Sequence, residues 1–271
     1  MKKTRRIGSW IYSALIFIFL YAPIFVLIIF SFNESKSRGK WGGFSLKWYE
    51  SLFHNDVIMQ SLYNTLLIAL TASIIAVIIG TLASLGFYYS RRRVRNLLMN
   101  ITSLPMLNAD IVTGISLLLL FTFVGLKLGY LSLLLAHITF NIPYVILSVM
   151  PKLNQLDKNT FEAALDLGAT PLQAFFKVML PEISPGVVTG FLLAFTMSID
   201  DFVISFFTTG ADVSTLSVTI YSMTRRGIKP EINALSAIMF IVVLTLLLIV
   251  NIRSSRDEAK KAAHRLSSNR S

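Results

Sequence analysis

The sequence has little charge and no cysteine. Its 271 residues are 54% hydrophobic and only 14% charged, and its mean hydropathy is +0.67. Soluble globular domains carry about 25% charged residues, so this composition predicts a membrane protein. The absence of cysteine excludes disulfides, thiolate metal ligands and cysteine nucleophiles. Only three scattered histidines are present (His54, His137 and His264), so we predict no metal site.

The net charge of +11 has two interpretations. In a soluble protein it would indicate nucleic acid as a partner, whereas in a membrane protein it is typical of basic cytoplasmic loops near anionic lipid. We favour the second, with membrane lipid as a partner and no nucleic acid. The sequence also lacks a Gly-x-x-x-x-Gly-Lys-Ser/Thr phosphate-binding loop. We therefore predict that the chain is not an enzyme and does not itself hydrolyse ATP.

Long apolar stretches predict six transmembrane helices. Five of these stretches cover about 8–32, 61–89, 101–124, 131–150 and 234–252. A sixth, at 186–207, is interrupted by acidic residues. Each has about 19 residues or more, and a spanning helix needs about 20. The first stretch is too long for the core of a cleaved signal peptide, so we expect it to be retained. The predicted fold is an all-α membrane protein with one transmembrane domain over residues 1–271.

The basic residues predict the orientation of these helices. With a cytoplasmic N-terminus, 17 of the 25 Lys and Arg residues lie on the cytoplasmic side. The contrast between the Arg91–Arg95 cluster and the nearly neutral turn at 125–130 is the strongest indication. Both termini are then cytoplasmic. The long connection at 151–185 is also cytoplasmic, as is the basic tail at 253–271, which we expect to lie near anionic lipid.

The connection at 151–185 is predicted to form two short helices joined by a bend. Thr160 is suited to cap a helix that starts one residue later, because its hydroxyl can accept a backbone N–H bond. Glu162 would then lie in the first turn, where the helix dipole favours a carboxylate. Gly168 is expected to end this helix and Pro171 to open the next, which Pro181 ends.

This segment resembles the EAA loop of permease subunits of binding-protein-dependent ABC importers. The family pattern is E-A-A, three residues, G, nine residues, I, one residue and L-P. With Val178 in place of isoleucine, every spacing is matched by Glu162, Ala163, Ala164, Gly168, Leu180 and Pro181. In the family this loop lies in a groove of the ATP-binding subunit. The resemblance implies that Glu162 is the polar contact, that the two alanines pack closely, and that Gly168 forms the bend.

Over nearly its whole length the chain is similar to the permeases of bacterial spermidine/putrescine importers, their C-type subunit in particular. Shared stretches include Lys47-Trp48-Tyr49, His137-Ile138-Thr139-Phe140 and Ser198-Ile199-Asp200-Asp201. The resemblance implies a type I ABC importer permease fold in the bacterial inner membrane. Its implied partners are a second homologous permease in a pseudo-symmetric heterodimer, two copies of an ATPase that binds ATP-Mg, and an extracytoplasmic polyamine-binding protein. No cofactor is expected in this chain.

Three acidic residues fall within predicted spans. Asp110 lies 13 residues beyond Leu97, about 20 Å along a helix, and Asp200 lies at nearly the same depth beside Asp201. An acid at the bilayer centre costs about 2.5–3.5 kcal/mol, so such residues usually face a polar cavity. Successive helical residues point about 100° apart, so Asp200 and Asp201 cannot both face it. The alternative is that these acids pair with neighbouring helices and hold the fold together.

Carboxylates with almost no basic residue at that depth favour a cation as the cargo. A linear polyamine carries protonated amines separated by methylenes, so it needs spaced carboxylates and aromatic faces. The predicted pathway comprises Asp110, Asp200, Asp201, Phe191, Phe195 and Tyr221. Together with the family resemblance, these residues predict import of spermidine or putrescine. A permease for another cationic solute is an alternative, as is a proton-coupled secondary transporter in which the acids relay protons.

Two further patterns concern packing. Gly186 and Gly190 have the small-xxx-small spacing that lets helices approach closely, and so do Ala76, Gly80 and Ser84. His137 lies on an otherwise apolar helix. We expect it to form an interhelical hydrogen bond rather than to bind a ligand.

Overall fold

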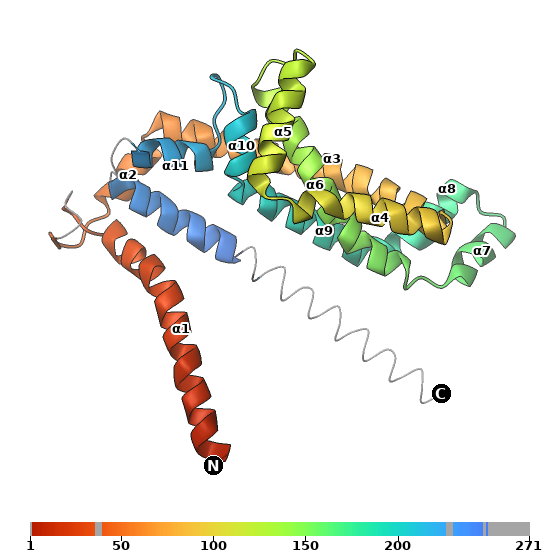
Figure 1. Ribbon diagram of the computed structural model, residues 1–271, viewed down its shortest axis with the longest axis horizontal. Coiled ribbons are helices and arrows are strands. Elements are labelled where there is room, and N and C mark those ends of the chain that lie inside the picture. Colours follow the sequence, from red (N-terminus) through yellow and green to blue (C-terminus); the bar gives the residue numbers. More distant parts are fainter. Residues whose placement is uncertain (1, 36–39, 226–229, 246–247, 249–271) are drawn as a thin grey trace. The chain divides into compact units, whose positions relative to one another are not determined.

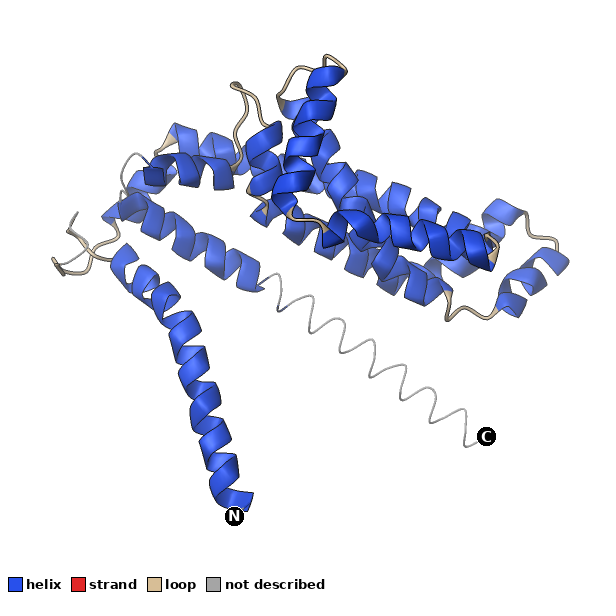
Figure 2. Ribbon diagram, viewed as in Figure 1, coloured by secondary structure: helices blue, strands red, loops and turns tan. Residues whose placement is uncertain are grey.

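The chain is described by a computed structural model that covers residues 2–35, 40–225, 230–245 and 248 (Figure 1). Within these residues the structure consists of helices and loops, with one isolated β-bridge between Asn33 and Phe44 (Figure 2). The described chain is therefore all-α, as predicted. It divides into two compact units, one formed by residues up to 60 together with 219–245, the other by 61–218.

The first unit contains three main elements, which are α1 (Lys2–Ser31), α2 (Lys47–Phe53) and the helix Pro230–Thr245. Trp48 on α2 is buried, and its indole N–H donates a hydrogen bond to the carbonyl oxygen of Asn33 at 2.7 Å. The Ser51 hydroxyl donates to the carboxylate of Glu231 at 2.8 Å. These two bonds attach α2 to the loop after α1 and to the helix Pro230–Thr245.

The second unit holds nearly all of the remaining helices. Their bounds are α3 (Asp56–Tyr89), α4 (Arg92–Leu107), α5 (Asp110–Phe123), α6 (Tyr130–Leu153), α7 (Lys158–Asp166), α8 (Pro171–Ala174), a π-helical turn (Phe175–Met179), α9 (Leu180–Asp200), α10 (Val203–Thr208) and α11 (Leu216–Arg225). The first residues of α3 and the last residues of α11 belong to the first unit. The largest helix–helix contact in this unit is between α6 and α9.

Glycines let α6 approach its neighbours closely. A Cβ atom on Gly186 of α9 would lie 2.8 Å from the carbonyl oxygen of Ser148, and one on Gly190 would lie 3.2 Å from Cα of Val145. On α3, a Cβ atom on Gly80 would lie 2.8 Å from Cβ of Val145. Real Cβ atoms essentially never approach other atoms within 3.0 Å, so Gly186 and Gly80 admit no added methyl group without a shift, while the contact at Gly190 is tighter than most real Cβ contacts. The small-xxx-small prediction is confirmed on both helices.

The core of this unit is formed by α6 and the helices that contact it. One cluster joins α3, α6, the π-helical turn and α9 through Ala76, Val145, Ile146, Val149, Met150, Leu153, Met179, Ile183 and Ala194. A second cluster joins α5, α6 and α10 through Leu117, Phe121, Ala136 and Ile204. Because no hydrophobic force drives helices together within lipid, this close packing is the main attraction between them.

The described residues include four helices long and apolar enough to cross a membrane, which are Tyr12–Ser31, Asp56–Tyr89, Tyr130–Leu153 and Pro171–Asp200. The stretch predicted as one span at 101–124 is instead a pair of helices, α4 and α5, bent by 102°. The break falls at Asn108 and Ala109. Pro105 removes one backbone N–H bond near the end of α4, which weakens the helix before the break. Counted as one broken span, this pair gives a fifth crossing.

The last predicted span along the chain, at 234–252, is described only to Thr245 and at residue 248. Its described part is the apolar helix Pro230–Thr245, which is shorter than a full span. The predicted basic tail at 253–271 lies outside the described residues. Six spans and cytoplasmic termini therefore stay predictions.

The contact between α6 and α9 predicts a large effect of one added methyl group. Gly186→Ala should destabilise the protein by about 1–3 kcal/mol, because its Cβ would overlap the Ser148 carbonyl oxygen and the Lys152 side chain. Gly86→Ala is the matched control, since no atom lies within 4 Å of the added methyl group. Thermal unfolding of the purified chain in detergent measures both. Equal melting temperatures for the two variants would contradict the packing account.

Candidate functional site

The connection between α6 and α9 begins with the helix α7, capped by an aspartate. The Asp157 carboxylate accepts a hydrogen bond from the backbone N–H of Asn159 at 3.0 Å, and α7 starts at Lys158. The prediction that Thr160 caps this helix was wrong, because the helix starts one turn earlier. Glu162 consequently lies in the second turn rather than the first. Aspartate and threonine are both good N-caps, and the sequence offered both within four residues.

The bend after α7 is formed by Gly168, as predicted. Its φ is +86°, a left-handed conformation that strongly favours glycine. Thr170 then caps α8, because its hydroxyl accepts from Gln173 N–H at 3.3 Å while the Gln173 side chain accepts from Thr170 N–H at 3.1 Å. The prediction that the helix ends at Pro181 was wrong. Pro171–Asp200 is one long helix through a π-helical turn, and Pro181 lies within it.

The two faces of α7 have different surroundings. Phe161 packs against the core cluster that joins α3, α6, the π-helical turn and α9, and Ala164 is half-buried. Glu162 and Ala163 are exposed. The helix is thus anchored on one side and presents a carboxylate and a small side chain on the other. An exposed carboxylate next to alanine is suited to a charge-assisted bond with an approaching Arg or Lys.

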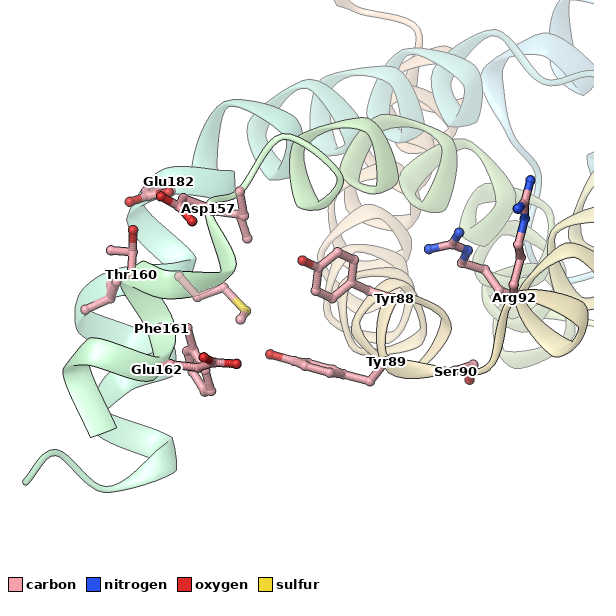
Figure 3. Close-up of a pocket in the computed structure, with 13 residues that line it drawn as sticks. Tyr88, Tyr89, Ser90, Arg92, Asp157, Thr160, Phe161, Glu162 and Glu182 are labelled. Atoms are coloured by element: carbon pink, nitrogen blue, oxygen red, sulfur yellow. The ribbon is translucent and has the colours of Figure 1, made fainter. Parts of the chain in front are cut away.

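A pocket of about 480 Å³ lies beside α7 (Figure 3). The side chains of Glu162 and Tyr89 point toward each other across it. Its lining comes from the end of α3, the start of α4, the residues just before α7, α7 itself, the π-helical turn and the start of α9. It consists of Tyr88, Tyr89, Ser90, Arg92, Arg95, Leu156, Asp157, Thr160, Phe161, Glu162, Val178, Met179 and Glu182. Sequence reasoning missed the two tyrosines, because they lie more than 70 residues from Glu162 in the chain.

At the opposite end of α9, Asp201 holds a helix junction. Its carboxylate accepts backbone N–H bonds from Ser205 at 2.7 Å and from Ile204 at 3.2 Å, so it caps α10. Its Oδ2 also lies 3.6 Å from Nε2 of His137 on α6, and its side chain is 7% exposed. Asp200, the last residue of α9, is exposed. The two adjacent acids therefore point into different surroundings, but the reason differs from the one predicted, because Asp201 has an extended backbone and lies outside α9.

His137 connects three helices. It is 1% exposed, its Nδ1 lies 2.5 Å from the Ser198 hydroxyl on α9, and its Nε2 lies 3.0 Å from the Ser205 hydroxyl on α10. These contacts are interhelical hydrogen bonds, as predicted. Together with the 3.6 Å contact between His137 Nε2 and Asp201 Oδ2, they bridge the break between α9 and α10. Ser205 had no signal in the sequence, because nothing local relates it to His137.

Asp110 is the first residue of α5, directly after the bend from α4. The predicted depth of about 20 Å along one straight helix was therefore wrong, because the helix is broken just before it. Asp110 is exposed and lines a small pocket with Pro105, Met106, Thr113, Phe140, Tyr144 and Ile204. Its carboxylate is thus accompanied by aromatic rings from α6.

The predicted aromatic residues are in two places. Phe191 and Phe195 stack on α9 with ring centroids 6.0 Å apart. Tyr221 belongs to the other unit, where the Arg225 guanidinium lies over its ring at 5.7 Å. Among the described residues no group of three or more His, Cys, Asp or Glu side chains is placed to hold a metal ion. The role of these residues in a pathway stays a prediction.

Comparison with known proteins identifies the family. The binding-protein-dependent transport system inner membrane component family matches residues 76–254. The chain belongs to this family. It is a membrane permease component of a transport system and not a catalytic subunit. Membership in this family agrees with the EAA spacing from Glu162 to Pro181. It also agrees with the long apolar helices before and after this segment.

Several curated members of the family are similar over most of the chain. The spermidine/putrescine permease protein PotC of Haemophilus influenzae is 42% identical over 87% of this chain and 91% of its own. PotC of Escherichia coli K12 is 39% identical, over 90% and 92%. The putrescine permease protein PotI of Escherichia coli K12 is 41% identical, over 82% of both. The resemblance to polyamine permeases is therefore confirmed.

Solved structures give the fold. A bacterial ABC transporter that imports the acidic polysaccharide alginate has a chain with TM-score 0.69 and 17% identity, covering 92% of this chain and 96% of that one. A chain of an amino acid ABC transporter has TM-score 0.57 and 16% identity, covering 77% and 98%. At these identities the likeness is one of fold, and it is that of ABC importer permeases.

The junction at His137 predicts a stability effect. His137→Leu should lower the melting temperature of the purified chain clearly, because it leaves the buried Asp201 carboxylate and two serine hydroxyls without their partner. Thr139→Ala, two residues away, is the control, since its hydroxyl bonds only its own helix at Leu135 and is exposed. A His137→Leu variant that melts with the control would rule out a structural role for the cluster.

Proposed function

We propose that this chain is the membrane permease of an ATP-driven importer that moves polyamines into the cytoplasm. The observation that carries this proposal is α7, an anchored helix between α6 and α9 that exposes Glu162 and Ala163 with the family's EAA spacing. The named relatives at about 40% identity transport spermidine and putrescine, which supports the same class of cargo here.

In this proposal both termini and α7 are cytoplasmic. The distribution of Lys and Arg between the connections supports this orientation. The partners are a second homologous permease, two ATPase subunits that bind ATP-Mg, and an extracytoplasmic polyamine-binding protein. One of the alginate importer structures is a complex with a periplasmic binding protein, which supports a partner of this kind. The location is the bacterial inner membrane.

The coupling follows from how α7 is attached. When the ATPase pair closes on ATP, it displaces the helix that holds Glu162. Phe161 transmits this movement to the core cluster, because it packs against this cluster, whose members include residues of α6 and α9. These two helices move together, since their backbones touch at Gly186 and Gly190. The far end of α9 carries Asp200, so movement at α7 reaches the acid that we assign to the cargo.

The cargo site in this proposal combines separated carboxylates with aromatic rings. Asp110 and Asp200 are exposed, whereas Asp201 is used to cap α10 and to contact His137. We therefore assign Asp110 and Asp200 to the amines and Asp201 to positioning. Phe191 and Phe195 offer stacked faces on the same helix as Asp200, suited to cation–π contact with methylene-linked amines.

Charge reversal on α7 tests the coupling role. Glu162→Lys should reduce the amount of ATPase that co-purifies by about tenfold or more, because it opposes a cation of the partner. Glu182→Lys is the control, since this exposed acid lines the same pocket from α9 and is outside the motif. Pull-down of the ATPase with each full-length variant measures the effect. Equal recovery with both variants would reject the assignment of Glu162.

Neutralising the exposed acids tests the cargo. Asp110→Asn and Asp200→Asn should each weaken stimulation of ATP hydrolysis by spermidine without loss of subunit assembly, because each removes a charge partner for an amine. Asp212→Asn is the control, as this acid is 77% exposed and pairs with Lys127. The assay is ATP hydrolysis by the reconstituted complex over a range of spermidine concentrations. Unchanged stimulation in both variants would assign these acids to the scaffold.

A further inference from the structure

A groove of about 380 Å³ lies between α4 and α6. Its lining is Arg95, Asn96 and Met99 from α4, with Leu147, Met150, Pro151 and Asn154 from the end of α6. All seven residues belong to the same compact unit. The groove contains none of the acids and aromatics assigned to the cargo, and of its seven residues only Arg95 also lines the pocket beside α7.

The lining changes from polar to apolar along the groove. Arg95 and Asn96 lie in the first turns of α4, and Asn154 directly follows the last residue of α6, so the polar groups share one end. Met99 lies one turn further along α4, and Leu147 lies two turns back along α6. A ligand that fits this gradient has a polar head and an apolar chain.

The polar end is strongly positive. Arg91, Arg92 and Arg93 precede Arg95 at the start of α4, and the first turn of this helix contains no acidic residue. The partial positive charge of the helix N-terminus adds to that of the four arginines. Within the described part of the chain, no carboxylate forms an ion pair with any of the four. The head of a matching ligand is therefore an anion.

The outer surface of α4 indicates an apolar medium. Val94, Leu97, Ile101 and Leu104 recur at helical spacing and are 46–60% exposed, and α4 has no buried residue. The arginine cluster directly follows the end of α3, which is long and apolar enough to span the membrane. In the orientation proposed above, the polar end of the groove lies at the level of the lipid headgroups, and its apolar end extends toward the hydrocarbon.

We propose that this groove binds an anionic phospholipid. The phosphate bonds the guanidinium of Arg95, with Asn96 and Asn154 beside it, and the first methylenes of an acyl chain lie along Met99 and Leu147. Arg95 is the specific contact because it is half-buried and lines the groove, whereas the other three arginines are exposed. A guanidinium presents paired donors that match two phosphate oxygens. In the proposed orientation the lipid comes from the cytoplasmic leaflet.

The test is a lipid titration of the full-length chain in non-ionic detergent, with any subunits that co-purify, followed by native mass spectrometry. Phosphatidylglycerol should bind at a saturable stoichiometry, and phosphatidylcholine should bind at least about tenfold more weakly. Glycerol phosphate at the same concentration should not displace the lipid. Displacement by glycerol phosphate would identify a soluble phosphate site and overturn the proposal, as would equal binding of the two lipids.

Matched variants locate the site. Arg95→Gln should weaken phosphatidylglycerol binding by about tenfold or more, whereas Arg93→Gln, with the same charge change on the same helix, should weaken it by less than about fivefold. Leu147→Trp fills the groove without changing charge and should also weaken binding. Circular dichroism and gel filtration identify folded variants. Equal losses for the two arginine variants, or full binding by Leu147→Trp, would show only general attraction to the cluster and reject the groove.

Discussion

The close contact between the backbones of α6 and α9 is the constraint on which the rest of this structure depends. Gly186 and Gly190 bring α9 so near to α6 that a Cβ added at Gly186 would overlap the Ser148 carbonyl oxygen and one added at Gly190 would lie only 3.2 Å from Cα of Val145. Both helices then hold the elements at their ends. At one end they anchor α7 through the core cluster that includes Phe161, and at the other they hold α10 through His137. Helix α7 and the exposed Asp200 are thus attached to opposite ends of one helix pair.

The same helix pair contains a short polar row. His137 and Asn141 lie one turn apart on α6 and are both buried. His137 is bonded to Ser198 on α9 and to Ser205 on α10. This row therefore ties α6 to both sides of the break that follows Asp200.

Much of this structure was predictable because its signals are local. Apolar length predicted the four long apolar helices, the EAA spacing predicted the segment of α7, and glycine spacing predicted the close helix contacts. The errors came where several local signals competed. Thr160 and Asp157 are both good N-caps, and the structure uses Asp157, the earlier of the two. Pro181 lies inside a helix because a π-helical turn precedes it, and the break before Asp110 follows Asn108 rather than a glycine. Contacts such as His137 with Ser205 depend on tertiary packing and have no local signal.

In the proposed mechanism, a partner ATPase acts on α7, and its ATP hydrolysis drives polyamine import through this chain. This mechanism is tested most directly by uptake of labelled spermidine into vesicles that contain this chain, its partner permease, the ATPase and the binding protein. The account predicts uptake with ATP and none with a proton gradient alone. Uptake driven by a proton gradient in vesicles without the ATPase would contradict it, and would make the chain a secondary transporter.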